Sequence, residues 1–250
     1  NSGTLNFKGN KKVGKIFQAE LDKLGFKTYW VTYPKEIKRS GHLFAEMRGG
    51  KGQNILLIGH LDTVFEPDHP FQKYTRKGDT AYGPGVSDMK AGDVSMIYIM
   101  KALDKIGVLH DLNLTLAFTG DEEKTGGPVS IVRKELVEAG KWANIGLGFE
   151  GAVGMNTGTI ARRSSSSWVL TTTGIQGHSS QIFKDHLGYG AIFEASRILN
   201  AFREELAPEE YLTFNPGTTV GGTDVTYDPV NSKGTTFGKT NVVAQSVTCK

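Results

Sequence analysis

The sequence predicts an α/β protein of two parts: a layered α/β/α domain with a mixed, largely parallel sheet, followed by a smaller α+β domain. Residues 54–60 and 112–119 are apolar almost without interruption, as in strands buried on both faces of a sheet. Segments with helical spacing alternate with these strands. From about residue 160 the sequence becomes polar and β-prone, which is typical of a sheet with one face in water.

The larger domain begins with a helix and leads into its first central strand. Residues 10–24 place apolar side chains at helical spacing, and Gly25 supplies a C-terminal cap. Two β-branched and aromatic runs, residues 27–33 and 42–47, predict strands. The apolar run at 54–60 follows them and predicts a strand covered on both faces.

The second half of this domain alternates helix and strand. Residues 89–106 predict a helix with one apolar side, and residues 112–119 predict the second buried strand. A helix is expected from Pro128 to residue 139, because proline suits a first turn, and Gly140 is expected to end it. Residues 145–149 predict a third strand.

The smaller domain shows weaker signals. Residues 164–173 mix polar and β-prone side chains, residues 190–202 predict a helix, and residues 217–222 and 241–248 predict short strands. The segment 234–240 falls one residue short of a phosphate-binding loop, and no helix follows it, so we expect a turn there. We place the domains at residues 1–163 and 164–250.

Composition excludes several classes of protein. The 29 basic and 26 acidic residues give a net charge of +3 and are dispersed, so neither nucleic acid nor an anionic membrane is an expected partner. The longest apolar runs are far shorter than the roughly 20 residues that span a bilayer. We expect a soluble protein, either cytoplasmic or exported with its leader removed. The single cysteine, Cys249, excludes a thiolate cluster, so a metal would need His, Asp and Glu ligands.

Candidate ligands follow the predicted strands of the larger domain. Each candidate lies at the carboxyl end of a strand or in the glycine-rich loop before a helix, and in open α/β sheets that edge binds ligands. The candidates are His60, Asp62, Asp88, Glu122, Glu123 and Glu150.

These residue types point to a metal centre. The period of a strand puts His60 and Asp62 on the same side, so the carboxylate can fix the orientation of the ring. Several carboxylates in one cleft would repel each other unless cations neutralised them. Two divalent ions would suffice. A nitrogen and oxygen donor set without thiolates suits Zn²⁺, with Co²⁺ or Mn²⁺ as substitutes.

Four motifs resemble those of the di-zinc peptidases and deacylases that include glutamate carboxypeptidase, aminoacylase, acetylornithine deacetylase and succinyl-diaminopimelate desuccinylase. The motifs stand here as Gly-His60-Leu-Asp62-Thr-Val, Gly-Pro-Gly-Val-Ser-Asp88-Met-Lys-Ala-Gly, Thr-Gly-Asp-Glu122-Glu123 and Phe-Glu150. Their order and separations are similar to those of the family. The segment Gly177-His178-Ser179-Ser180 also resembles the histidine motif that opens the family's smaller domain, so the resemblance extends over essentially the whole chain.

The resemblance implies a role for each residue of the larger domain. His60 and Glu150 would bind one zinc ion, Glu123 the other, and Asp88 would bridge the two. Asp62 would orient His60, and Glu122 would be the general base. In the family a last histidine ligand lies far beyond residue 250, so we expect one metal position to be incomplete in this chain.

The resemblance also implies that residues 164–250 form a lid domain through which two copies dimerise. His178 would reach the active site of the neighbouring subunit and stabilise the developing oxyanion or the substrate carboxylate. Asn241 would contact substrate. The family usually has a proline where this chain has Ala244, which is a departure from the pattern near Asn241.

Three functions are compatible with these motifs. The first is a zinc-dependent hydrolase that cleaves an amide or peptide bond next to a free carboxylate, in a small peptide or an N-acyl amino acid. The second is an aminopeptidase of the same family, and the third is a homologue that binds a partner without catalysis. Glu150, where some aminopeptidase relatives have aspartate, favours the first.

Overall fold

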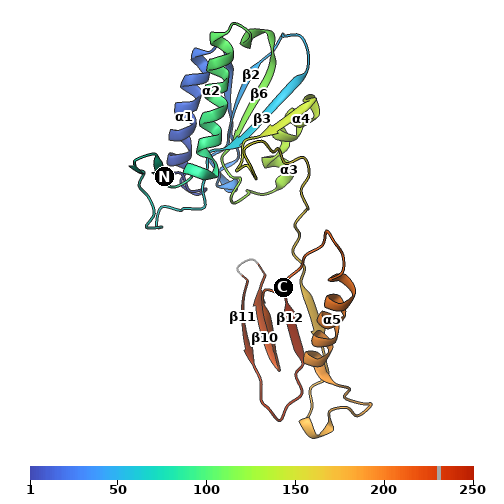
Figure 1. The fold of residues 1–250 in the computed structure, drawn as a ribbon. Helices are drawn as coiled ribbons and strands as arrows, with labels where there is room; N and C mark the ends of the chain where they lie inside the picture. The colour runs from blue at the N-terminus through green and yellow to red at the C-terminus, as the bar shows by residue number, and fades with distance from the viewer. Residues whose placement is uncertain (230–231) are drawn as a thin grey trace. The chain divides into compact units, whose positions relative to one another are not determined.

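A computed structural model describes residues 1–229 and 232–250 of the chain. The chain divides into two compact units, Asn1–Thr159 and Ile160–Lys250 (Figure 1). Each unit has its own sheet and its own buried apolar cluster.

A mixed sheet forms the centre of unit 1, with the strand order β1-β2-β6-β3-β7. Its strands are β1 (Lys27–Val31), β2 (His42–Met47), β3 (Asn54–His60), β6 (Asn113–Thr119) and β7 (Ile145–Gly148). β3 runs parallel to both β6 and β7, whereas β1–β2 and β2–β6 are antiparallel. The prediction of a mixed sheet is confirmed, but it is only partly parallel, because no crossover helix joins β1 to β2.

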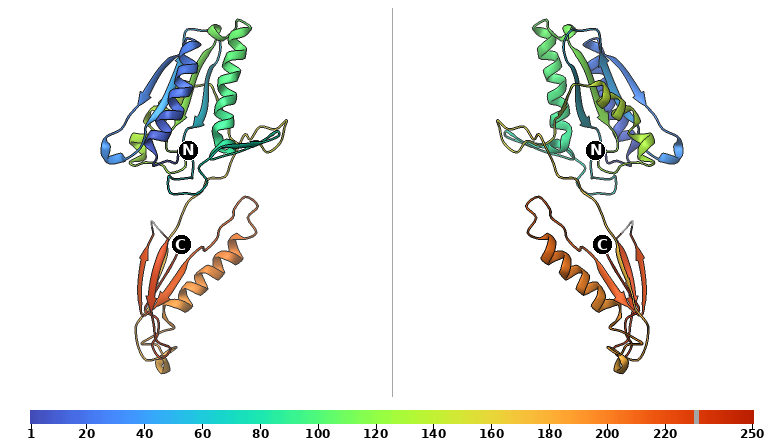
Figure 2. Two further views of the ribbon diagram at one scale, coloured as in Figure 1. Left: turned by 90° about the vertical axis from the view of Figure 1, so that its left-hand side faces the viewer. Right: turned by 90° about the vertical axis from the view of Figure 1, so that its right-hand side faces the viewer.

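Helices cover both faces of this sheet (Figures 1 and 2). α1 (Phe7–Lys23) and α2 (Ala91–Lys105) pack on one face, where Phe17 and Met96 join the buried cluster that includes Phe118. α4 (Lys134–Trp142) packs on the other face, where Ala139 meets Phe44. The predicted α/β/α layering is therefore confirmed.

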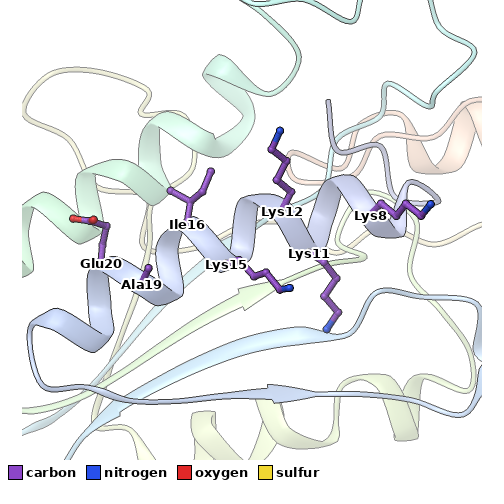
Figure 3. Close-up of a pocket in the computed structure, with 7 residues that line it drawn as sticks. All are labelled: Lys8, Lys11, Lys12, Lys15, Ile16, Ala19 and Glu20. Atoms are coloured by element: carbon purple, nitrogen blue, oxygen red, sulfur yellow. The ribbon is translucent and has the colours of Figure 1, made fainter.

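The outward face of α1 is basic. Lys8, Lys11, Lys12 and Lys15 line a shallow hollow of about 680 Å³ along this helix (Figure 3). Lys11 Nζ lies 3.4 Å from the centroid of the Trp30 ring, and burial together with Lys15 lowers the pKa of Lys11 to about 8. This solvated face opposite the buried one accounts for the amphipathic pattern of the segment.

Two helices of unit 1 differ from their predictions. One irregular turn, η2 (Val86–Lys90), precedes α2, so the regular helix begins at Ala91 rather than at residue 89. The helix expected from Pro128 is two helices, α3 (Val129–Val132) and α4, which meet at Arg133. α4 continues through Gly140, which costs an exposed helix only about 1 kcal/mol.

The remaining elements of unit 1 are short. A hairpin that the sequence did not predict is formed by β4 (Thr75–Lys77) and β5 (Thr80–Tyr82). Single turns of 3-10 helix are η1 (Lys35–Ile37) and η3 (Leu109–Asp111).

Unit 2 is a small antiparallel α+β structure. Its sheet has the order β8-β12-β9, from β8 (Leu170–Thr173), β9 (Thr219–Gly222) and β12 (Ser246–Cys249). α5 (Gly190–Leu206) packs on this sheet, and Ala191 and Ala195 join Val247 and Cys249 in the core. One short turn, η4 (Ser179–Gln181), follows β8.

Unit 2 also corrects the prediction of a turn at residues 234–240. A second sheet pairs β10 (Asp224–Asp228) with β11 (Lys233–Phe237). The glycines at either end of this segment suggest a turn, but Thr235 and Thr236 are β-branched and pair with the facing strand. The strand expected within 164–173 is confined to its last four residues.

None of the helices among the described residues combines the length and the apolar character that a transmembrane span requires.

Candidate metal centre

The predicted ligands of unit 1 come together because three neighbouring strands end at one edge of the sheet. β3 lies between β6 and β7 and runs parallel to both, with His60 opposite Thr119 and Ile58 opposite Gly148. The side chains that follow these strands, Asp62, Glu122, Glu123 and Glu150, therefore emerge at the same edge. Asp88 arrives from η2, in front of α2.

The His60 ring faces three carboxylates. Its Nε2 atom lies 3.0 Å from Asp88 Oδ1, 3.3 Å from Glu150 Oε1 and 3.9 Å from Glu122 Oε2. Ligand atoms of His60, Asp88 and Glu150 all lie within 4.8 Å of one another. Two ligands bound to one zinc ion at about 2.0 Å in tetrahedral geometry lie about 3.3 Å apart. The donor set and its spacing therefore fit one divalent cation.

Asp62 connects this ring with the turn that carries the two glutamates. The carbonyl oxygen of Asp62 lies 3.1 Å from His60 Nδ1, and its carboxylate Oδ1 lies 3.4 Å from the same nitrogen. The carboxylate also accepts hydrogen bonds from the backbone N–H groups of Glu122 at 3.0 Å and Glu123 at 3.1 Å. Thr4 Oγ1 donates a further bond at 2.7 Å. Asp62, fully buried, thus fixes the histidine and the glutamate turn with one side chain.

The charges of the cluster shift the pKa of its members. Burial lowers the pKa of His60, but the hydrogen bond to Asp62 and the neighbouring carboxylates outweigh burial and raise it to about 9. For Asp62, hydrogen bonds from His60, Thr4 and Glu122 outweigh the effect of burial and lower the pKa. Burial, and then the charge of Asp88, raise the pKa of Glu123. These shifts reflect a buried imidazole and several carboxylates placed close together with no cation between them.

Two further buried groups lie close to this cluster and were not predicted. Asp93 is fully buried, and neither its carboxylate oxygens nor Lys90 Nζ makes a hydrogen bond among the described residues. Burial raises the pKa of Asp93 to about 8 and lowers that of Lys90. Lys90 ends η2 and Asp93 lies in the first turn of α2, and helical spacing alone gives no signal that distinguishes them from core or surface positions.

His42, to which the sequence assigns no role, supports the end of β6. It is fully buried; its Nδ1 accepts from the backbone N–H of Gly120 at 3.1 Å, and its Nε2 donates to the carbonyl of Val132 at 2.8 Å. Burial lowers the pKa of this ring. Only the pairing of β2 with β6 reveals this role.

The two predicted substrate contacts lie together in unit 2. The Ser179 backbone N–H donates to the carbonyl of Asn241 at 2.9 Å, and His178 pairs with Val242 in an isolated bridge. His178 and Asn241 are exposed, and His178 Nδ1 accepts from the backbone N–H of Ser180 at 3.2 Å. The structure brings these two residues together, while their relation to the His60 cluster stays a prediction.

Comparison with known proteins places the chain in a family. The sequence matches peptidase family M20/M25/M40 over residues 56–245, and the chain belongs to this family. Carboxypeptidase G2 of Pseudomonas sp. (strain RS-16) is 31% identical over 206 residues, which cover 79% of this chain and 47% of the relative. Succinyl-diaminopimelate desuccinylase of Gluconobacter oxydans is 29% identical over 201 residues, which cover 76% and 49%.

Solved structures share the fold. A tripeptidase from Staphylococcus aureus matches with a TM-score of 0.67 at 20% identity, over 100% of this chain and 61% of that chain. The present chain spans about half the length of the two curated relatives.

Proposed function

We propose that this chain carries most of the metal centre of a hydrolase that cleaves an amide or peptide bond next to a free carboxylate. The observation that supports this most directly is the position of His60 Nε2, which faces Asp88, Glu150 and Glu122 at 3.0, 3.3 and 3.9 Å. A hydrolytic site needs ligands together with one carboxylate that is available for proton transfer. Glu122 meets the second need, because its Oε2 lies farther from His60 Nε2 than the oxygens of Asp88 and Glu150 do, and its side chain is half exposed.

The metal we propose is zinc, with two ions per subunit and with Co²⁺ or Mn²⁺ as substitutes. His60 and Glu150 would hold one ion and Glu123 the other, with Asp88 between them. A donor set of one imidazole and several carboxylates, with no thiolate, suits these metals. When bound, the ions would polarise the amide carbonyl and make a water molecule acidic.

The chain's own side chains would then move the proton. Glu122 would accept a proton from the attacking water and pass it to the leaving nitrogen. Asp62 would keep His60 in one orientation and the Glu122 backbone in place through the hydrogen bonds described above. A general base must not itself bind the metal ions. The position of Glu122 at the edge of the cluster supports its assignment as the general base.

The substrate we propose is a small peptide or an N-acyl amino acid. The names of the two curated relatives, a carboxypeptidase and a desuccinylase, both describe cleavage at an acylated nitrogen. We assign residues 1–163 to the catalytic domain and residues 164–250 to a lid domain that dimerises. His178 and Asn241 would bind the substrate carboxylate or the developing oxyanion at the active site of a second subunit.

The test is an assay of the full-length protein with measured metal content. We expect zinc to copurify or to restore activity after chelation, and we expect turnover of N-acyl amino acids and of dipeptides with a free carboxylate. The matched control is the same dipeptide with its carboxylate amidated, which should be a poor substrate. Turnover that requires a free amine instead of a free carboxylate would identify an aminopeptidase. Full zinc occupancy without turnover on either panel would contradict the hydrolase and favour a binding protein.

A further inference from the structure

The segment that carries Glu122 and Glu123 has no regular structure, yet side chains from elsewhere in the fold bind its backbone. Residues 120–126, here called the glutamate loop, connect the end of β6 to the turn before α3. A loop without a hydrogen-bond ladder normally moves unless its polar groups find other partners. In the glutamate loop, most backbone groups have such partners.

Arg133 holds the beginning of the loop. Its Nη1 donates to Asp121 Oδ1 at 2.5 Å, and its Nη2 donates to the Asp121 carbonyl at 3.1 Å and to Thr125 Oγ1 at 3.2 Å. Asp121 is fully buried, and its Oδ2 accepts from the Gly126 backbone N–H at 2.8 Å. The Arg133 guanidinium therefore ties the two ends of the loop to each other.

Arg39 holds the other side of the loop. Its Nε donates to the carbonyl of Lys124 at 2.8 Å, and its Nη2 donates to the carbonyl of Thr125 at 3.2 Å. The neighbouring Ser40 Oγ donates to the carbonyl of Gly120 at 3.2 Å. With the Asp62 bonds to Glu122 and Glu123, the loop is bound from both sides along its length.

The two arginines leave the glutamate side chains free. Among the described residues, no ion pair joins Arg39 or Arg133 to Glu122 or Glu123; the guanidinium groups bind backbone carbonyls, Thr125 and Asp121 instead. Two adjacent carboxylates beside Asp88 repel each other, and this repulsion would displace an unsupported loop. The arrangement thus fixes the backbone without neutralising the carboxylates.

We propose that Arg133 and Arg39 are positioning residues that hold the general base and the second-metal ligand in their working geometry. The inference rests on the proposed hydrolase function. Arg133 acts through the Asp121 side of the loop and Arg39 through the carbonyls that follow Glu123. A displacement of about 1 Å at a catalytic group costs roughly 100-fold in rate, which sets the size of the expected effect.

The experiment compares Arg133→Met and Arg39→Met in the full-length protein, with Arg76→Met in the exposed β4–β5 hairpin as the control. For both loop variants we expect kcat to fall about 10- to 100-fold with KM changed by less than about threefold. Arg133→Lys keeps the positive charge and one donor group in place of the guanidinium, so it should recover part of the loss.

A second readout does not depend on turnover. Calorimetric titration with Zn²⁺ should show the weaker of two binding events reduced by about tenfold in both loop variants, because Glu123 is a ligand there. In the Glu122→Gln background at saturating Zn²⁺, Arg133→Met should lower the residual kcat by much less than in the wild type, because much of its effect on kcat acts through the Glu122 carboxylate.

The outcomes separate the two proposals. A folded Arg133→Met protein with unchanged kcat and unchanged Zn²⁺ affinity would overturn the positioning role, as would full additivity with Glu122→Gln. If Arg133→Met does not fold, Asp121→Asn tests the same link with a side chain of the same shape. A wild-type protein that binds Zn²⁺ but hydrolyses no substrate would contradict the proposed function, while loss of Zn²⁺ affinity in the loop variants would still support the positioning role.

Discussion

At the scale of single residues, the proposed roles fall into three groups: side chains that would bind metal, one that would transfer protons, and others that orient them. His60, Asp88 and Glu150 meet at ligand spacing, and Glu122 lies at the rim. The carboxylate oxygens of Asp62 accept hydrogen bonds from Thr4 and from the backbone N–H groups of Glu122 and Glu123, as expected of a residue that orients others. These positions make the roles experimentally separable.

Replacement of Glu122 by Gln should remove turnover and leave metal binding intact. The amide cannot accept a proton at neutral pH, so we expect kcat to fall by roughly 100- to 10,000-fold. Zinc content, measured by elemental analysis, should equal that of the wild type. Glu36→Gln in η1, outside the site, is the matched control. Loss of zinc together with activity would show that Glu122 is a ligand instead.

Replacement of Asp62 by Asn should weaken metal binding. Asn has one acceptor oxygen, so its amide group would face one of the two backbone N–H donors of Glu122 and Glu123. We expect Zn²⁺ affinity to fall by about 10- to 100-fold in calorimetry, as for other residues that orient metal ligands. Thr4→Val removes only one of the bonds to this carboxylate and should cost less than about threefold. Equal effects of the two variants would contradict the central role of Asp62.

At the scale of elements, His42 at the beginning of β2 supports the end of β6 in its neutral form. It accepts the Gly120 N–H through Nδ1, which a protonated ring cannot do. Burial lowers its pKa below the ordinary value of 6.5, so the unfolded chain takes up a proton more readily than the folded one. The free energy of unfolding should therefore be fully retained above about pH 6.5 and decrease as the pH falls below it.

The measurement is urea unfolding of wild type and His42→Gln between pH 5 and 7 in the presence of a chelator. The wild type should lose up to about 1.4 kcal/mol per pH unit more than the variant in this window. Taking the difference between the two proteins cancels the contribution of His60. Identical slopes would show that His42 titrates alike in the folded and unfolded states.

The elements that the sequence predicted are those whose burial imposes a pattern. β3 and β6 are central strands, and their apolar runs reveal them. The strands of the β4–β5 and β10–β11 pairs are mostly exposed and contain no fully buried residue, so no apolar run marks them. The break between α3 and α4 falls at Arg133, with neither glycine nor proline to signal it.

The candidate ligands were predictable because each follows a strand directly or lies in a glycine-rich loop. The residues that hold these ligands in place could not be predicted from the sequence. Arg39 lies 85 residues before Lys124, and Thr4 lies 58 residues before Asp62, so only the folded chain brings these partners together. Local sequence patterns do not indicate hydrogen bonds between residues so far apart in the chain.

At the scale of the whole molecule, unit 2 presents apolar side chains of α5 to solvent. Ile192 and Phe193 are 49% and 55% exposed, and Phe183, whose ring lies 5.8 Å from that of Phe193, is 68% exposed. Exposed apolar groups that cluster in this way are common where proteins associate. They support the proposal that unit 2 dimerises.

Phe193→Glu should therefore dissociate the proposed dimer. A charge on the apolar face would be desolvated on association, so we expect the dissociation constant to rise at least about 100-fold in sedimentation experiments. Ile99→Glu on α2 in unit 1, at a side chain of similar exposure, should leave the oligomeric state unchanged. A Phe193→Glu protein that remains dimeric would place the interface elsewhere.

The many anchors of the glutamate loop also restrict how its length can vary during evolution. Asp62 accepts from two consecutive N–H groups, while Arg39 and Arg133 bind the carbonyls on either side. One inserted residue would shift Glu122 and Glu123 relative to all of these hydrogen bonds at once. Their carboxylates would then no longer point into the cluster. Insertions and deletions should therefore accumulate at the exposed β4–β5 tip, where a side chain at Gly78 would meet no other atom, and be eliminated from residues 120–126.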